Sequence, residues 1–108
     1  MDKQNYFDGF DCWSSVTGNF EIKMLEPGYV WAKYETGCYD GQALVIYKID
    51  DTWYQVNASH CSCYGLEDQF HPEILDVKLH LEAVKEGKSL IDNFVGTDGL
   101  NEWLEANL

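Results

Sequence analysis

The sequence predicts an α+β fold in which an antiparallel sheet comes first along the chain and C-terminal helices pack on one face of it. Two observations support this class. Between Tyr29 and Ala58, runs of strand-forming residues are separated only by short loops. After Ala58, the apolar residues recur mostly at helical spacing. The chain has 108 residues, 45% of them hydrophobic and 15% aromatic, which suits a single domain over residues 1–108 with a packed core.

The N-terminal part of the chain has weaker patterns. We expect residues 1–5 to be frayed. The spacing of aromatic residues over 6–16 favours a short helix, and 17–19 has the composition of a turn. Residues 20–25 alternate in a way that suggests a strand, and a turn at 26–28 follows.

The middle of the chain predicts three strands, at residues 29–36, 42–49 and 52–58. A glycine-bounded loop at 37–41 separates the first two, and a turn at Asp50-Asp51 separates the last two. Because such short connections require antiparallel pairing, we expect a meander of three to four strands. Residues 42–49 are the most apolar of the three and are expected at the centre of the sheet.

The C-terminal part predicts helices. One is expected from Leu75 to Glu86, closed by Gly87. Residues 90–95 also have helical spacing. A last helix is expected to be capped by Thr97 or Asp98. Its apolar stripe consists of Leu100, Trp103, Leu104 and Leu108.

The charge of the chain limits its partners. Asp and Glu total 19 against seven lysines, there is no arginine, and the net charge is −12 with a pI near 4.3. Such a field repels DNA, RNA and anionic lipid, and it attracts basic surfaces such as the grooves in which other proteins hold nucleic acid. The acids are spread along the chain, so they are expected on the folded surface rather than in a tail. The alternative is that the charge serves solubility alone.

Nothing in the sequence predicts a membrane protein or an exported one. The chain has no run of about 18 apolar residues and its first residues lack the apolar core of a signal peptide. We therefore expect a cytoplasmic protein. Its cysteines are then expected to be reduced thiols; they are Cys12, Cys38, Cys61 and Cys63.

The last predicted helix carries a candidate binding ridge. Asp98, Glu102 and Glu105 have the spacing i, i+4, i+7, away from the apolar stripe, which would place carboxylates roughly 5–6 Å apart. Phosphates along a DNA strand are spaced on a similar scale, about 6–7 Å, so the ridge could occupy a phosphate track. The alternative is an ordinary solvated helix face. Further candidate partner-binding residues are Asp92, Asp50 and Asp51, and Trp31 or Trp53 could anchor the contact from the outer face of the sheet.

The segment from Ser59 to Pro72 contains cysteines and histidines and has three interpretations. A zinc site could use Cys61, Cys63 and His71 with Cys38 or Cys12, although Cys-x-Cys in an extended chain holds the sulfurs about 7 Å apart. A catalytic thiol could use Cys61 or Cys63 with His60 or His71, but no third, orienting group is evident. The favoured interpretation is structural, because free cysteines are usually buried and behave as small hydrophobic residues.

The string His60-Cys61-Ser62-Cys63-Tyr64-Gly65-Leu66-Glu67, followed by Phe70, Pro72 and Glu73, resembles a segment of small proteins encoded by bacteriophages and prophages. The preceding pair of strands, ending in residues 53–57, is also similar, and the resemblance covers residues 34–73, about a third of the chain. It implies a source in a phage or mobile element, and it carries no activity or site residues.

Small size, acidity and this resemblance together suggest a non-enzymatic inhibitor. Such a protein would bind the basic, nucleic-acid-binding surface of a host or defence complex in the bacterial cytoplasm, as anti-CRISPR and anti-restriction proteins do, without a cofactor. The alternative is a small structural or regulatory phage protein that binds zinc through the Cys61 and Cys63 segment.

Overall fold

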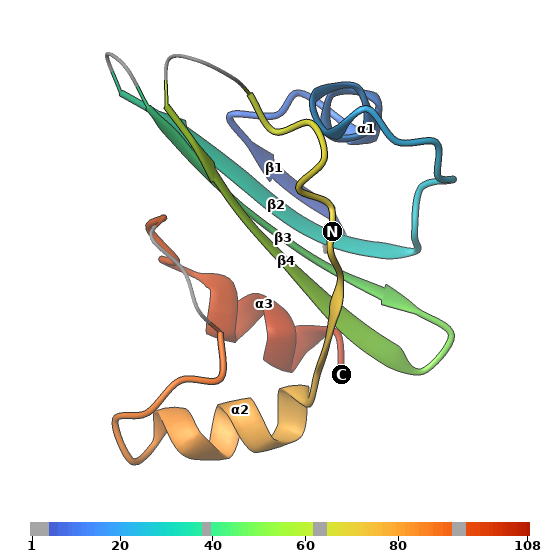
Figure 1. Ribbon diagram of the computed structural model, residues 1–108. Coiled ribbons are helices and arrows are strands. Elements are labelled where there is room, and N and C mark those ends of the chain that lie inside the picture. Colours follow the sequence, from blue (N-terminus) through green and yellow to red (C-terminus); the bar gives the residue numbers. More distant parts are fainter. Residues whose placement is uncertain (1–4, 38–39, 62–64, 92–94) are drawn as a thin grey trace.

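The structure is a computed structural model, and it describes residues 5–37, 40–61, 65–91 and 95–108. Within these ranges the chain forms five strands and three helices (Figure 1). In chain order they are β1 (Asn5–Asp8), α1 (Trp13–Phe20), β2 (Tyr29–Thr36), β3 (Gly41–Ile49), β4 (Thr52–His60), β5 (Glu73–Leu75), α2 (Val77–Val84) and α3 (Leu100–Ala106).

The strands form one mixed sheet in the order β1-β2-β3-β4-β5. The antiparallel meander of β2, β3 and β4 is confirmed, and β5 adds to it in the antiparallel direction. β1 pairs with β2 in the parallel direction, so the sheet is larger than expected and not purely antiparallel. Parallel neighbours need a long crossover connection, and here the crossover contains α1.

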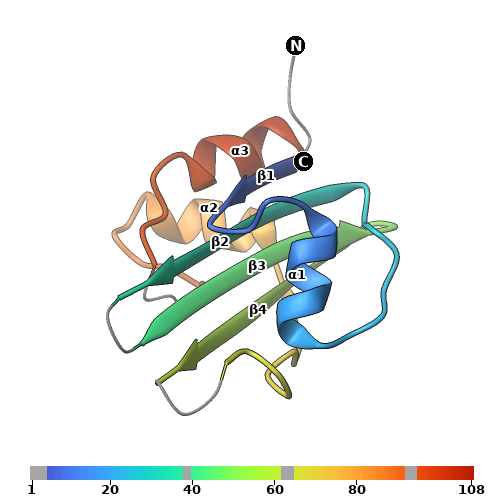
Figure 2. The same ribbon diagram turned by 90° about the horizontal axis from the view of Figure 1, so that it is seen from above.

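Helices cover both faces of the sheet (Figures 1 and 2). α2 and α3 pack on one face, as expected for the C-terminal helices, and α1 covers the other. The core under α1 includes Trp13, Val16 and Phe20 of the helix. The core under α2 and α3 includes Leu81, Leu100 and Leu104. β3 lies between the two cores, which explains why most of its residues are buried.

The strands of the meander lie close to where the sequence predicts them. β2 spans the predicted residues, and β3 is the central strand, as expected. Asp50 and Asp51 form the turn between β3 and β4. β4 continues to His60, two residues beyond its predicted end, because Ser59 and His60 still pair with β3.

The N-terminal expectations were largely wrong. Asn5 belongs to β1, and residues 1–4 lie outside the described ranges. The predicted helix at 6–16 is replaced by β1 and the start of α1, and the predicted turn at 17–19 lies inside α1. α1 forms although it contains Thr, Gly and Asn, which have low helix propensity, because its apolar face is buried against the sheet. Residues 21–28 are irregular rather than a strand, and the indole of Trp13 donates to the carbonyl of Met24 at 2.7 Å.

The C-terminal expectations were partly correct. α2 lies within the predicted range, and the side chain of Asp76 caps it by accepting the backbone N–H of Leu79 at 3.1 Å. Residues 92–94 lie outside the described ranges, and the residues on either side of them are not helical. α3 is capped by Gly99, at φ 81°, instead of by Thr97 or Asp98. Among the described residues, none of the helices is long and apolar enough to cross a membrane.

Candidate acidic interface

The carboxylates of this chain remain on its surface. All those in the described ranges are exposed except Glu67, which is partly buried. In the same ranges, the ion pairs that form all involve Lys33. Most of the negative charge is therefore not neutralised by neighbouring lysines, and it faces solvent.

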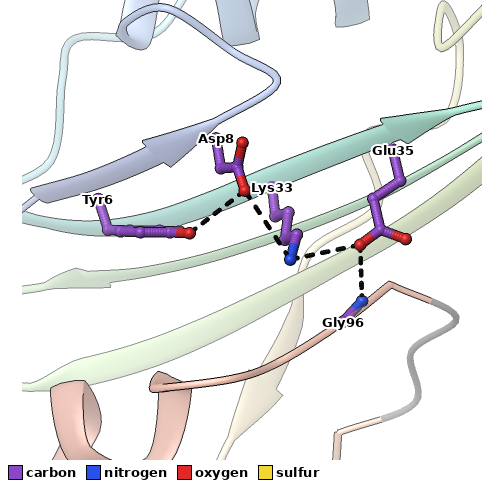
Figure 3. Close-up of polar contacts among 5 residues, drawn as sticks. All are labelled: Tyr6, Asp8, Lys33, Glu35 and Gly96. Carbon is purple, nitrogen blue, oxygen red and sulfur yellow. Dashed lines mark hydrogen bonds and ion pairs between the residues drawn. The ribbon is translucent and has the colours of Figure 1, made fainter.

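The ion pairs of Lys33 lie at the β1 edge of the sheet (Figure 3). The Lys33 side chain is 17% exposed, and its ammonium lies 3.8 Å from the Asp8 carboxylate and 3.3 Å from that of Glu35. The same Glu35 oxygen accepts the backbone N–H of Gly96 at 2.9 Å, and Asp8 accepts the hydroxyl of Tyr6 at 3.3 Å. These contacts tie the segment that precedes α3 to the sheet.

The electrostatics of this network follow from those contacts. The N–H of Gly96, and then the Lys33 ammonium, lower the pKa of Glu35. Partial burial, followed by the Asp8 carboxylate, raises the pKa of Tyr6. Asp98 acts on Tyr6 in the same direction as Asp8, so its carboxylate lies within electrostatic reach of this network. Asp8, Glu35 and Asp98 therefore carry more negative charge at this edge than Lys33 offsets.

α3 runs from this network toward the opposite end of the sheet (Figure 2). Just before the helix, the backbone N–H of Gly96 donates a hydrogen bond to the Glu35 carboxylate. Farther along, the ring of Trp103 lies 5.6 Å from that of Trp53, and Leu108 lines a cleft together with Asp51. The β2 stretch from Tyr29 to Glu35 that separates these ends spans about 20 Å of extended chain. The segment from Gly96 to Leu108, which contains α3, thus lies between two groups of acids that are distant in the sequence.

The predicted ridge is partly rearranged. Glu102 and Glu105 are exposed on α3, but Asp98 precedes the helix, so the helical spacing applies only to the two glutamates. Asp50 and Asp51 are exposed in the turn beyond β3, and Asp92 lies outside the described ranges. We call the exposed carboxylates along this path the α3 track; they are Asp8, Glu35, Asp98, Glu102, Glu105, Asp50 and Asp51.

Sequence reasoning missed two members of the track, Asp8 and Glu35. They meet because β1 pairs in parallel with β2, which places Asp8 beside Lys33. No local pattern reports such a pairing, although a single lysine two residues before Glu35 in residues 29–36 is a weak signal. The predicted aromatic anchors were wrong, because Trp31 and Trp53 are both buried under the C-terminal helices.

A second polar group, formed by Tyr34 and His60, joins the C-terminal ends of β2 and β4. The hydroxyl of Tyr34 is hydrogen-bonded to Nε2 of His60, and Nδ1 of His60 lies 3.0 Å from the carbonyl of Cys61. A carbonyl can only accept, so Nδ1 donates and Nε2 accepts the hydroxyl proton of Tyr34. The group thus uses both ring nitrogens of His60 to connect two strands across β3.

The metal and thiol hypotheses concern residues that the structure covers in part. Cys38 and Cys63 lie outside the described ranges, whereas Cys12, Cys61 and His71 are exposed. Across the described ranges, no group of three or more His, Cys, Asp or Glu residues is placed to hold a metal ion. The zinc alternative therefore stays a sequence-based prediction.

Comparison of this chain with protein-family models, with curated proteins and with solved structures found no match.

Proposed function

We propose that this chain is a non-enzymatic binding protein that occupies the basic, nucleic-acid-binding surface of another protein and excludes nucleic acid from it. The observation that carries the proposal is the α3 track: exposed carboxylates lie at the Lys33 network, on α3 at Glu102 and Glu105, and in the Asp50-Asp51 turn. In the described part of the chain, Lys33 is the lysine that forms ion pairs with members of this track. A row of anions on a rigid support suits a groove that binds a row of phosphates.

The fold supports the rigidity that such a contact requires. Leu100 and Leu104 are buried, Trp103 packs against Trp53, and the Glu35 carboxylate holds the segment before α3. A surface that is ordered before binding loses less conformational entropy when the complex forms. The segment around Cys61 resembles segments of phage-encoded proteins. We therefore propose that the partner is a host or defence complex of the kind that anti-CRISPR and anti-restriction proteins block.

The test is competition with nucleic acid. Immobilised protein is exposed to nuclease-treated bacterial lysate at low salt, and the captured proteins are then challenged with duplex DNA or with RNA. We expect the captured partner to be released by nucleic acid and by a modest rise in salt, because the contact resembles a phosphate contact. Capture that resists both, or no capture at low salt, would overturn the proposal.

A charge-reversed variant makes this test specific to the track. Glu102→Lys combined with Glu105→Lys should abolish capture, whereas Cys61→Ser should leave it unchanged. Loss of capture in the Cys61 variant instead would point to the thiol segment, and capture that survives the double reversal would exclude the α3 track.

A further inference from the structure

The β3–β4 hairpin end of the molecule has two hollows that meet at Lys48. The larger, of about 550 Å³, lies between β4, β5 and the start of α2, and its lining includes Trp53, Ile74 and Leu108. The smaller, of about 360 Å³, lies between β3 and the segment before β2, and its lining includes Leu25 and Ile49. Ligand clefts in proteins have volumes of roughly 300–1,000 Å³, so both are large enough to receive side chains of a partner.

Large apolar side chains are exposed around these hollows. Leu25 is 92% exposed, Ile74 is 75% exposed and Leu108 is 55% exposed. Most of the large hydrophobic residues that the described surface exposes lie at this end. Exposed apolar residues that gather around a concave surface mark an interaction site, because burying them on binding is favourable.

The charges around the hollows favour a basic occupant. Carboxylates line them in greater number than ammonium groups: Glu26, Asp50, Asp51 and Asp76 against Lys48 and Lys78. The Lys48 ammonium lies 5.5 Å from the ring centres of both Tyr29 and Trp53, so it is engaged with these rings. An apolar centre with an acidic rim is therefore the chemistry that this end offers.

The wall of the larger hollow is held in place before binding. Trp53 contacts Trp103 at 5.6 Å between ring centres and Tyr29 at 6.4 Å, and it is buried in the core under α2 and α3. The Asp50-Asp51 turn, which ends the α3 track, forms the rim between the hollows. The hollows and the track are thus continuous.

We propose that the hairpin end binds an extended protein segment that carries large apolar side chains between lysines or arginines. This inference rests on the proposed function, since it assumes a basic partner. It adds that the partner inserts apolar side chains beside Trp53, Ile74 and Leu25, and that these contacts supply affinity which the screened charges along α3 do not.

Two peptides of equal charge test the proposal. Each is about eight residues long, the length of an ordinary bound strand; one alternates lysine with leucine and the other alternates lysine with serine. At about 150 mM salt, where exposed charges are largely screened, the leucine peptide should bind at least about tenfold more tightly, because one well-buried leucine is worth that much. Amide signals of residues 48–53 and 74–78 should shift on binding.

Matched variants locate the contact. Ile74→Ser and Leu25→Ser should each weaken the leucine peptide several-fold and leave the serine peptide unaffected. Leu79→Ser is the control, because Leu79 is 51% exposed but lies on α2 outside both hollows. Equal effects of all three substitutions would overturn the inference.

The outcomes separate this inference from the proposed function. If both peptides bind equally at low salt and shift residues 98–105 but not residues 48–53 or 74–78, the hairpin-end site is wrong and the acidic interface stands. If neither peptide binds at low salt, the acidic interface itself is wrong. If the signals of residues 48–53 broaden with protein concentration alone, a second copy of the chain occupies the hollows and the inference fails.

Discussion

At the residue scale, Gly41 shows how one missing side chain permits a cross-strand contact. A Cβ at this position would collide with Nε2 of His60 and approach Cε1 of Tyr34 to 2.9 Å. The Tyr34–His60 hydrogen bond therefore lies directly over Gly41, and the space it needs exists only because residue 41 is glycine.

We expect Gly41→Ala to destabilise the protein by about 1–3 kcal/mol, the usual cost of overpacking a filled site. Gly18→Ala is the matched control, because a Cβ there meets nothing within 4 Å and Gly18 lies within α1. It should stabilise the protein by about 0.5–1 kcal/mol. Chemical denaturation measures both, and a neutral Gly41→Ala would show that the Tyr34–His60 contact is absent in solution.

Tyr47 gives a second residue-scale prediction, in alkaline solution. Burial, with a contribution from Tyr54, raises the pKa of Tyr47 from its ordinary value of 10 to about 12. The unfolded chain loses this proton at lower pH than the folded chain, so the stabilisation is complete below pH 10 and disappears as pH rises toward 12. Tyr47→Phe should therefore lose less stability over this interval than the parent protein, measured by denaturation at a series of pH values. Parallel losses would contradict the prediction.

At the scale of elements, α3 allows binding to be separated from stability. Glu105 is exposed in the last turn of α3, where the partial negative charge of the helix end favours a cation. Glu105→Lys should therefore leave stability unchanged or raise it by a few tenths of a kcal/mol, although it removes a carboxylate from the α3 track. Its affinity for the lysine–serine peptide at low salt should fall several-fold.

Glu21→Lys is a closely matched control. It makes the same change of charge at the C-terminal end of α1, which covers the opposite face of the sheet. If the two variants weaken binding equally, the peptide senses only the total charge, and the α3 track has no special role.

The elements also show what could be predicted from the sequence. β2, β3 and β4 were predictable because short turns join them and because their patterns are local. β1 and β5 were not, since each is short and depends on a partner strand supplied from elsewhere in the chain. The same limit applies to the site: the acidity of α3 is visible in the sequence, whereas the junction of Asp8, Lys33 and Glu35 depends on a parallel pairing.

At the scale of the whole molecule, the net charge of −12 acts on a body with a radius of gyration of 13.5 Å. At about 0.01 M salt the screening length is about 30 Å, so every carboxylate repels the others across the fold. At about 0.1 M the screening length is about 10 Å, and repulsion is limited to near neighbours. The expanded unfolded chain suffers less from this repulsion, so low salt penalises the folded state selectively.

The thermal midpoint should therefore rise between these two salt concentrations, and a relief of about 1 kcal/mol corresponds to about 4 °C or more in a domain of this size. Calorimetry in sodium chloride measures the shift. The double variant Glu21→Lys/Glu105→Lys should show a smaller rise, because it removes part of the net negative charge without opening the core. A midpoint that stays constant or falls with salt would mean that the surface carboxylates are compensated in solution, and it would remove the physical basis for an acidic surface that seeks a basic partner.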